Sequence, residues 1–166
     1  MATQGRRTDP PLEDLLFAEG YRFSFFQAVR LLEHLYPHRQ PVGQDAQPSH
    51  EVVRFRTHLS LGFPASEIHE ITPPTDEEQP AQMTVTFMGL TGPSGVLPRH
   101  YTEFLLERVR RKDYTLHDFL DLFNHRLLSL FYRAWEKYRF PISYERTVLQ
   151  HQRHDRLSLY LFDLIG

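Results

Sequence analysis

Two segments of the chain alternate between apolar and polar residues, which is the pattern of a β-strand with one buried face. In residues 52–62 the alternate positions on one side are Val53, Phe55, Thr57, Leu59 and Leu61, with arginine, histidine and serine between them. In residues 82–90, Met83, Val85 and Phe87 alternate with threonine and methionine. Because strand side chains repeat every two residues, each set lies on one face. We expect the two strands to pair antiparallel, as a small hairpin or sheet.

Other segments place apolar residues three and four positions apart, which predicts amphipathic helices. One helix is expected over residues 24–36, where Ser24 and Gln27 have the spacing of a capping box and Pro37 stops the run. Another begins at Pro98, because proline is favoured in the first turn, and continues to about Lys112.

The longest helix is predicted near residues 116–139. Its apolar positions are Leu116, Phe119, Leu120, Phe123, Leu127, Leu130, Phe131, Trp135 and Tyr138. Polar residues such as Asp118, Asp121 and Arg126 form the opposite face, where pairs three and four apart add slight stability. A helix this apolar on one side must be covered.

These elements predict an α+β fold that is mainly helical, with the small antiparallel sheet packed on the amphipathic helices. Residues 1–20 form a leader with a short helix that Gly20 closes, and residues 21–166 form a single domain. The acidic, proline-punctuated segment from Glu67 to Gln79 is expected to be a mobile loop open to a partner. The last helical pattern stops without a polar close, which suggests the N-terminal part of a longer protein.

Charge, cysteine content and aromatic content limit the classes of function that the chain can have. The 19 basic and 21 acidic residues give a formal net charge of −2, which disfavours nucleic-acid binding. There is no cysteine, no signal peptide and no apolar run long enough for a membrane span, so we expect a cytoplasmic protein. Phenylalanine, tyrosine and tryptophan make up 13% of the chain, and such side chains serve cores and protein interfaces.

The stretch FMGLTGPSGVLPRHYTE raises the question of a phosphate-binding loop. Its glycines lack the lysine and hydroxyl residue of a Walker A loop and the spacing of a dinucleotide loop. We predict instead a tight structural turn between strand and helix, with Pro93 at the second turn position and glycines where φ must be positive. The residues expected to build this turn are Gly89, Gly92, Pro93, Gly95 and Pro98.

Ten histidines prompt a search for metal ligands. His100 with Glu103, the set Asp118, Asp121 and His125, and the cluster near His151 do not have a zinc-binding spacing, and arginines lie beside each. We therefore expect no metal, no cofactor and no catalytic residue. Asn124, His125 and Arg126 interrupt an apolar stretch, which indicates a buried hydrogen-bond network or a partner contact.

Four segments, in order from about Tyr21 to Arg139, carry a family resemblance. They are RFSFFQAVRLLE, VRFRTHLSLGFPASEI, TVTFMGLTGPSGVLPRHYTEFLLERVRRKD and DFLDLFNHRLLSLFYRAWEKYR. Together they resemble the N-terminal half of the TssG family, also called ImpH or VasB, of bacterial type VI secretion systems.

The resemblance implies a structural subunit of the baseplate wedge, joined to TssF, TssE and TssK in the cytoplasm, on which tube and sheath assemble. It implies no catalysis, cofactor, small-molecule substrate or nucleic acid, and only indirect contact with the membrane. The partner-interface candidates are Phe123, His125, Phe131, Trp135 and Tyr138, with TssF as the expected neighbour. The alternative is a stand-alone adaptor domain that binds proteins without enzymatic activity.

Overall fold

The computed structural model describes residues 10–44, 47–76, 78–149 and 156–165. Its helices are α1 (Leu12–Ala18), the 3-10 turn η2 (Gly20–Arg22), α2 (Phe25–Leu35), α3 (Arg99–Arg110), α4 (Thr115–Glu136), α5 (Phe140–Leu149) and α6 (Arg156–Ile165). Its strands are β1 (Val53–Thr57), β2 (Ile68–Thr72) and β3 (Ala81–Val85). The predicted α+β class, mainly helical with a small sheet, is confirmed.

The sheet is mixed and has the order β1-β3-β2. The two predicted strands are adjacent, but β1 pairs with β3 in parallel, with Val53 opposite Ala81 and Thr57 opposite Val85. The expectation of antiparallel pairing is therefore wrong. Alternation defines which face of a strand is buried and carries no information on direction, and the connection between β1 and β3 is long enough to bring the chain back.

Strand β2 occupies part of the segment from Glu67 to Gln79 that was expected to be a mobile loop. It pairs antiparallel with β3, and its register shifts between Ile68 and Glu70, as at a β-bulge. The bulge places the buried residues Ile68 and Ile71 three positions apart, so the strand shows no alternation in the sequence. The loop expectation is corrected for residues 68–72.

The core lies between the sheet and helices α1, α2 and α4. Phe25, at the start of α2, is fully buried and contacts the rings of Phe55 and Phe87 at centroid distances of 5.4 and 5.1 Å. The predicted inward faces of the two alternating segments are confirmed within the strands, since Phe55 and Met83 are fully buried. Aromatic rings therefore connect α2 to the sheet.

Helix α2 ends before Pro37 as predicted, but its N-terminus is capped differently. Ser24 is the N-cap residue, yet among the described residues its side chain makes no capping hydrogen bond. The backbone N–H of Phe25 donates instead to Oε2 of Glu67, at 2.7 Å. A carboxylate at this end also interacts favourably with the helix dipole, so the segment before β2 fixes the start of α2.

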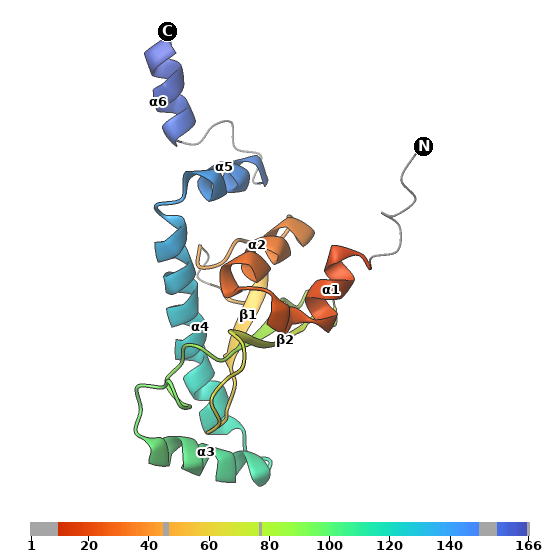
Figure 1. Ribbon diagram of the computed structural model, residues 1–166, viewed down its shortest axis with the longest axis vertical. Coiled ribbons are helices and arrows are strands. Elements are labelled where there is room, and N and C mark those ends of the chain that lie inside the picture. The colour runs from red at the N-terminus through yellow and green to blue at the C-terminus, as the bar shows by residue number, and fades with distance from the viewer. Residues whose placement is uncertain (1–9, 45–46, 77, 150–155, 166) are drawn as a thin grey trace.

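Helix α4 runs alongside β1 and forms the long axis of the molecule (Figure 1). Helix α3 lies at its N-terminal end, and α5 and then α6 lie beyond its C-terminal end. The two ends of α4 thus extend past the sheet (Figure 1).

Candidate functional site

Helix α4 turns a polar face toward the outer edge of β1. The backbone N–H of Phe55 donates to Nδ1 of His125 at 3.2 Å, and that of Thr57 donates to Oδ1 of Asp121 at 3.2 Å. These two N–H groups point away from β3, where a further strand would otherwise pair. Side chains of α4 therefore accept hydrogen bonds from the backbone N–H groups of β1, an edge strand that would otherwise be open to another strand.

Asn124 extends this network to the glycine stretch. Its Nδ2 donates to Thr57 Oγ1 at 3.0 Å and to Asp121 Oδ1 at 3.1 Å, and its Oδ1 accepts from the backbone N–H of Leu90 at 3.0 Å. The three partners come from β1, α4 and the turn after β3. One buried amide thus joins three parts of the fold, as expected for a residue in a low-dielectric interior.

Both ring nitrogens of His125 lie close to other parts of the fold. Nδ1 accepts from Phe55, and Nε2 lies 3.4 Å from Oε2 of the buried Glu51. His125 is only 3% exposed, so we assign it to this network and not to a partner surface. The predicted network of Asn124 and His125 is present, whereas Arg126 is exposed and lies outside it.

The apolar face of α4 is largely exposed, so the described residues of this chain do not supply the cover expected for it. The half-exposed residues on this side include Phe119, Leu122, Phe123, Leu127, Leu130 and Phe131. The buried face is mostly polar: Asp121, Asn124, His125, Leu128, Ser129, Tyr132 and Glu136. Both sets repeat at helical spacing, and the edge of β1 selects the polar one because its N–H groups need acceptors.

The sequence did contain a sign of this second stripe, which the prediction missed. Lysine and arginine do not occur at the buried positions of α4, whereas Arg126 and Arg133 lie at exposed positions of the helix. Long basic side chains are rarely buried, so a polar stripe free of them is compatible with burial.

The glycine stretch contains a tight turn with Pro93 at its second position, and of Gly89, Gly92 and Gly95 only Gly92 has a positive φ. The N–H of Gly95 donates to the carbonyl of Gly92 at 3.1 Å, and Gly92 has a φ of +95°. A Cβ on Gly95 would lie 2.6 Å from the carbonyl carbon of Thr91, and one on Gly89 would lie 2.8 Å from Cγ2 of Thr57. Pro98 is the N-cap of α3, one position before the predicted first turn.

Helices α3 and α4 each hold this turn through one side-chain hydrogen bond. Thr102 of α3 accepts the N–H of Gly92 on its hydroxyl at 3.1 Å, while Asn124 of α4 accepts that of Leu90. These donors are thereby used within the chain, so the turn is a corner in which two helices meet the sheet.

The C-terminal end of α4 adjoins a surface pocket of about 710 Å³. Trp135 stacks on Phe26 with ring centroids 4.3 Å apart and planes 13° apart, and Arg139 lies over its other side at 4.6 Å. Tyr138 also lines the pocket and is 83% exposed. Of the two candidates here, Trp135 is partly packed on the core and Tyr138 is accessible.

A buried charge network fastens α5 to α2 and α4. Arg146 donates to Glu33 at 2.9 Å and to Glu136, and Glu33 also accepts from the hydroxyl of Tyr132 at 3.1 Å. Burial raises the pKa of Glu136, and the charge of Arg146 opposes this shift only in part. Burial likewise raises the pKa of Tyr132, with Glu33 adding to the shift.

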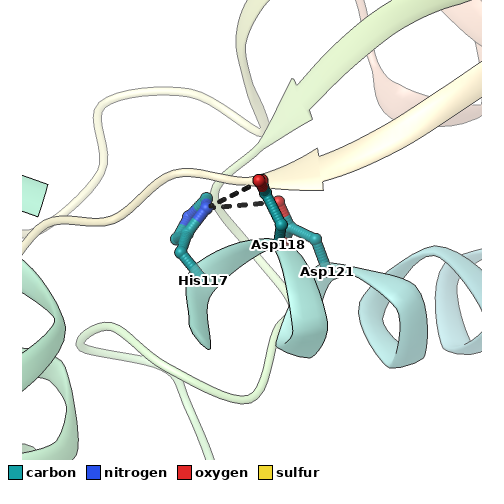
Figure 2. Close-up of side chains that lie close together, drawn as sticks. All are labelled: His117, Asp118 and Asp121. Carbon is teal, nitrogen blue, oxygen red and sulfur yellow. Dashed lines mark ion pairs between the residues drawn. The ribbon is translucent and has the colours of Figure 1, made fainter. Parts of the chain in front are cut away.

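Three side chains gather at the first turns of α4, as Figure 2 shows. Nδ1 of His117 lies 3.6 Å from Oδ2 of Asp121 and 3.9 Å from Oδ1 of Asp118. The ligand atoms of the three residues all lie within 4.8 Å of one another. The set compared in the sequence was Asp118, Asp121 and His125. In the structure His117 lies beside the two aspartates, and His125 faces β1.

In the part of the chain that the structure describes, no helix has both the length and the apolarity needed to cross a membrane. A family model described as "Type VI secretion, TssG" matches residues 19–166. No curated protein and no solved structure gives a significant match.

Proposed function

The chain belongs to the TssG family of type VI secretion, and from this premise we propose that it joins TssF, TssE and TssK in the baseplate wedge. The family is a structural family of the secretion baseplate and is not a known enzyme family. In the proposed role the chain works in the cytoplasm, at the baseplate docked on the membrane, and contacts the membrane only through the assembled machine. It needs neither a small-molecule substrate nor a nucleic acid.

The exposed apolar face of α4 is the observation that supports this proposal most directly. Phe123 is 51% exposed although its helix is anchored firmly on the opposite side by Asp121, Asn124 and His125. Helix α3 also exposes the large side chains of Tyr101 and Phe104. Contiguous apolar patches on a soluble chain mark interaction sites, and aromatic residues are enriched in protein interfaces.

We assign this face to TssF. Phe123 and Phe131 lie on it, while Trp135 and Tyr138 continue the contact at the C-terminal end of α4. Helix α4 can present a rigid row of anchors to a partner because its inner face is tied to the sheet. A rigid row loses little conformational entropy on binding, which favours a stable assembly.

Co-expression of the tagged chain with TssF, TssE and TssK, followed by pull-down, tests the proposed function. We expect TssF to be retained with the chain, and the chain alone to self-associate through the apolar face. A stable monomer that retains none of the three proteins would contradict the proposal and favour the stand-alone adaptor.

A further inference from the structure

We propose that His117, Asp118 and Asp121 form a Zn²⁺ site at the first turns of α4. The site would use Nδ1 of His117, Oδ1 of Asp118 and Oδ2 of Asp121, with water in the remaining position. Metal binding at this site would be separate from the proposed assembly role and would need no partner protein.

The first argument is the unequal environment of the two oxygens of Asp121. Oδ1 accepts from the N–H and the hydroxyl of Thr57 and from Nδ2 of Asn124. Oδ2 is buried and has no hydrogen-bond partner among the described residues, although Asp121 is only 3% exposed. A buried carboxylate oxygen without a partner is unfavourable, and this one points toward His117 (Figure 2).

The second argument is geometric. Four ligands at about 2.1 Å around a tetrahedral metal lie about 3.4 Å from one another. The 3.6 Å between His117 Nδ1 and Asp121 Oδ2 is close to that separation. Asp118 is 3.9 Å away from the same nitrogen, but its side chain is half-exposed and can rotate by the small amount required.

The third argument is that the neighbouring network already orients the ligands. Thr57 and Asn124 fix the carboxylate plane of Asp121, and such supporting hydrogen bonds are typical around protein metal ligands. One neighbour opposes a cation: Arg56 lies 3.6 Å from Asp118. Both of these side chains are exposed to solvent, so the pair is weak and a metal can displace it.

Calorimetric titration of the chain with Zn²⁺, together with its thermal unfolding with and without the metal, tests the site. We expect binding of one ion per chain and a higher unfolding temperature, because the metal binds only the folded arrangement. Asp118→Asn and His117→Gln should each weaken binding by about 10-fold or more, by analogy with losses around other metal sites. Arg56→Gln should strengthen it. Asp121 is left unchanged because it also supports β1.

His69→Gln is the matched control, since the rings of His69 and His58 lie 4.0 Å apart and this pair offers a second place for Zn²⁺. Binding that persists in this variant and is lost in Asp118→Asn supports the site. Zn²⁺ binding that is absent, or that Asp118→Asn leaves at wild-type affinity, overturns it.

Discussion

The backbone N–H of Phe55 donates a 3.2 Å hydrogen bond to Nδ1 of His125, so a helix side chain occupies the place of a neighbouring strand. The same relationship recurs two residues later, where Thr57 donates to Asp121. Donors two residues apart on β1 thus pair with acceptors four residues apart on α4. This match fixes which side of α4 faces the sheet and leaves its apolar side outward.

His125→Leu should destabilise the fold, because leucine fills similar space but leaves the buried N–H of Phe55 without an acceptor. We expect a loss of about 1–3 kcal/mol in the free energy of unfolding, measured by urea denaturation. Arg126→Ala is the control, since this neighbour is exposed and its change should stay within about 0.5 kcal/mol. Equal midpoints for the two variants would show that the hydrogen bond does not matter.

Gly95→Ala should distort the turn after β3. The added Cβ would meet backbone atoms of Thr91 at 2.6 and 2.7 Å, which cannot move aside as a flexible side chain can. A cost of about 1–3 kcal/mol is expected from overpacking of this kind. Gly62→Ala serves as the control, because its Cβ would come no closer than 3.5 Å to Ser60 Oγ. If both variants unfold at the same urea concentration, the corner is less rigid than we conclude.

Much of the fold was predictable from local patterns. The inward faces of β1 and β3 follow from alternation, α2 ends before Pro37, and the tight turn at Gly92 uses the positive φ that glycine allows. The missed features depend on contacts distant in sequence. Strand β2 is hidden by its bulge, the cap of α2 comes from Glu67, and the direction of β1 relative to β3 has no local signal.

The orientation of α4 depends on a contact that the local pattern does not show. Phe123 and Leu127 form an apolar stripe that would face the core if hydrophobicity alone set the orientation, and Asp121 with His125 form a polar one that would then be solvated. The open edge of β1 needs acceptors and therefore attracts the polar stripe. Spacing alone does not identify the metal candidate, because His117 and His125 both lie four residues from Asp121.

Glu136→Gln should change how stability depends on pH. Burial, only partly offset by Arg146, raises the pKa of Glu136 in the folded chain, so the folded state binds more protons than the unfolded state. Above the ordinary value of 4.5 this group therefore makes stability fall as the pH rises through the raised pKa. Glutamine cannot ionise, so the stability of the variant relative to wild type should improve from pH 4.5 upward.

Urea denaturation of both proteins at several pH values measures this difference. Arg126→Ala, which removes an exposed cation of the same helix, is the control for general charge effects. A stability difference between Glu136→Gln and wild type that is the same at every pH would contradict the raised pKa.

Trp135→Ala should weaken the fold itself as well as any contact with a partner. The indole stacks on Phe26 and also lies 5.7 Å from the ring of Tyr132, and truncation removes both contacts. Because the side chain is partly buried, we expect a loss of about 1–3 kcal/mol, less than for a fully buried tryptophan. Tyr138→Ala, at an exposed position, should leave the urea midpoint close to that of wild type. Equal midpoints would mean that Trp135 packs only on a partner.

Phe119 and Phe123 provide a cleaner test of the interface because both are half-exposed and their rings contact each other, 5.2 Å apart. The double variant Phe119→Ser/Phe123→Ser removes apolar surface from the outer face of α4 and leaves Asp121 and His125 in place. The matched control is Leu12→Ser/Tyr21→Ser, which changes two residues of similar exposure in α1 and η2, away from α4 (Figure 1).

Co-purification of these two variants with tagged TssF, each checked for wild-type helix content, is the most direct measurement. We predict that Phe119→Ser/Phe123→Ser loses TssF and that Leu12→Ser/Tyr21→Ser retains it at wild-type yield. Retention of TssF at wild-type yield by the folded Phe119→Ser/Phe123→Ser protein would contradict the assignment of this face.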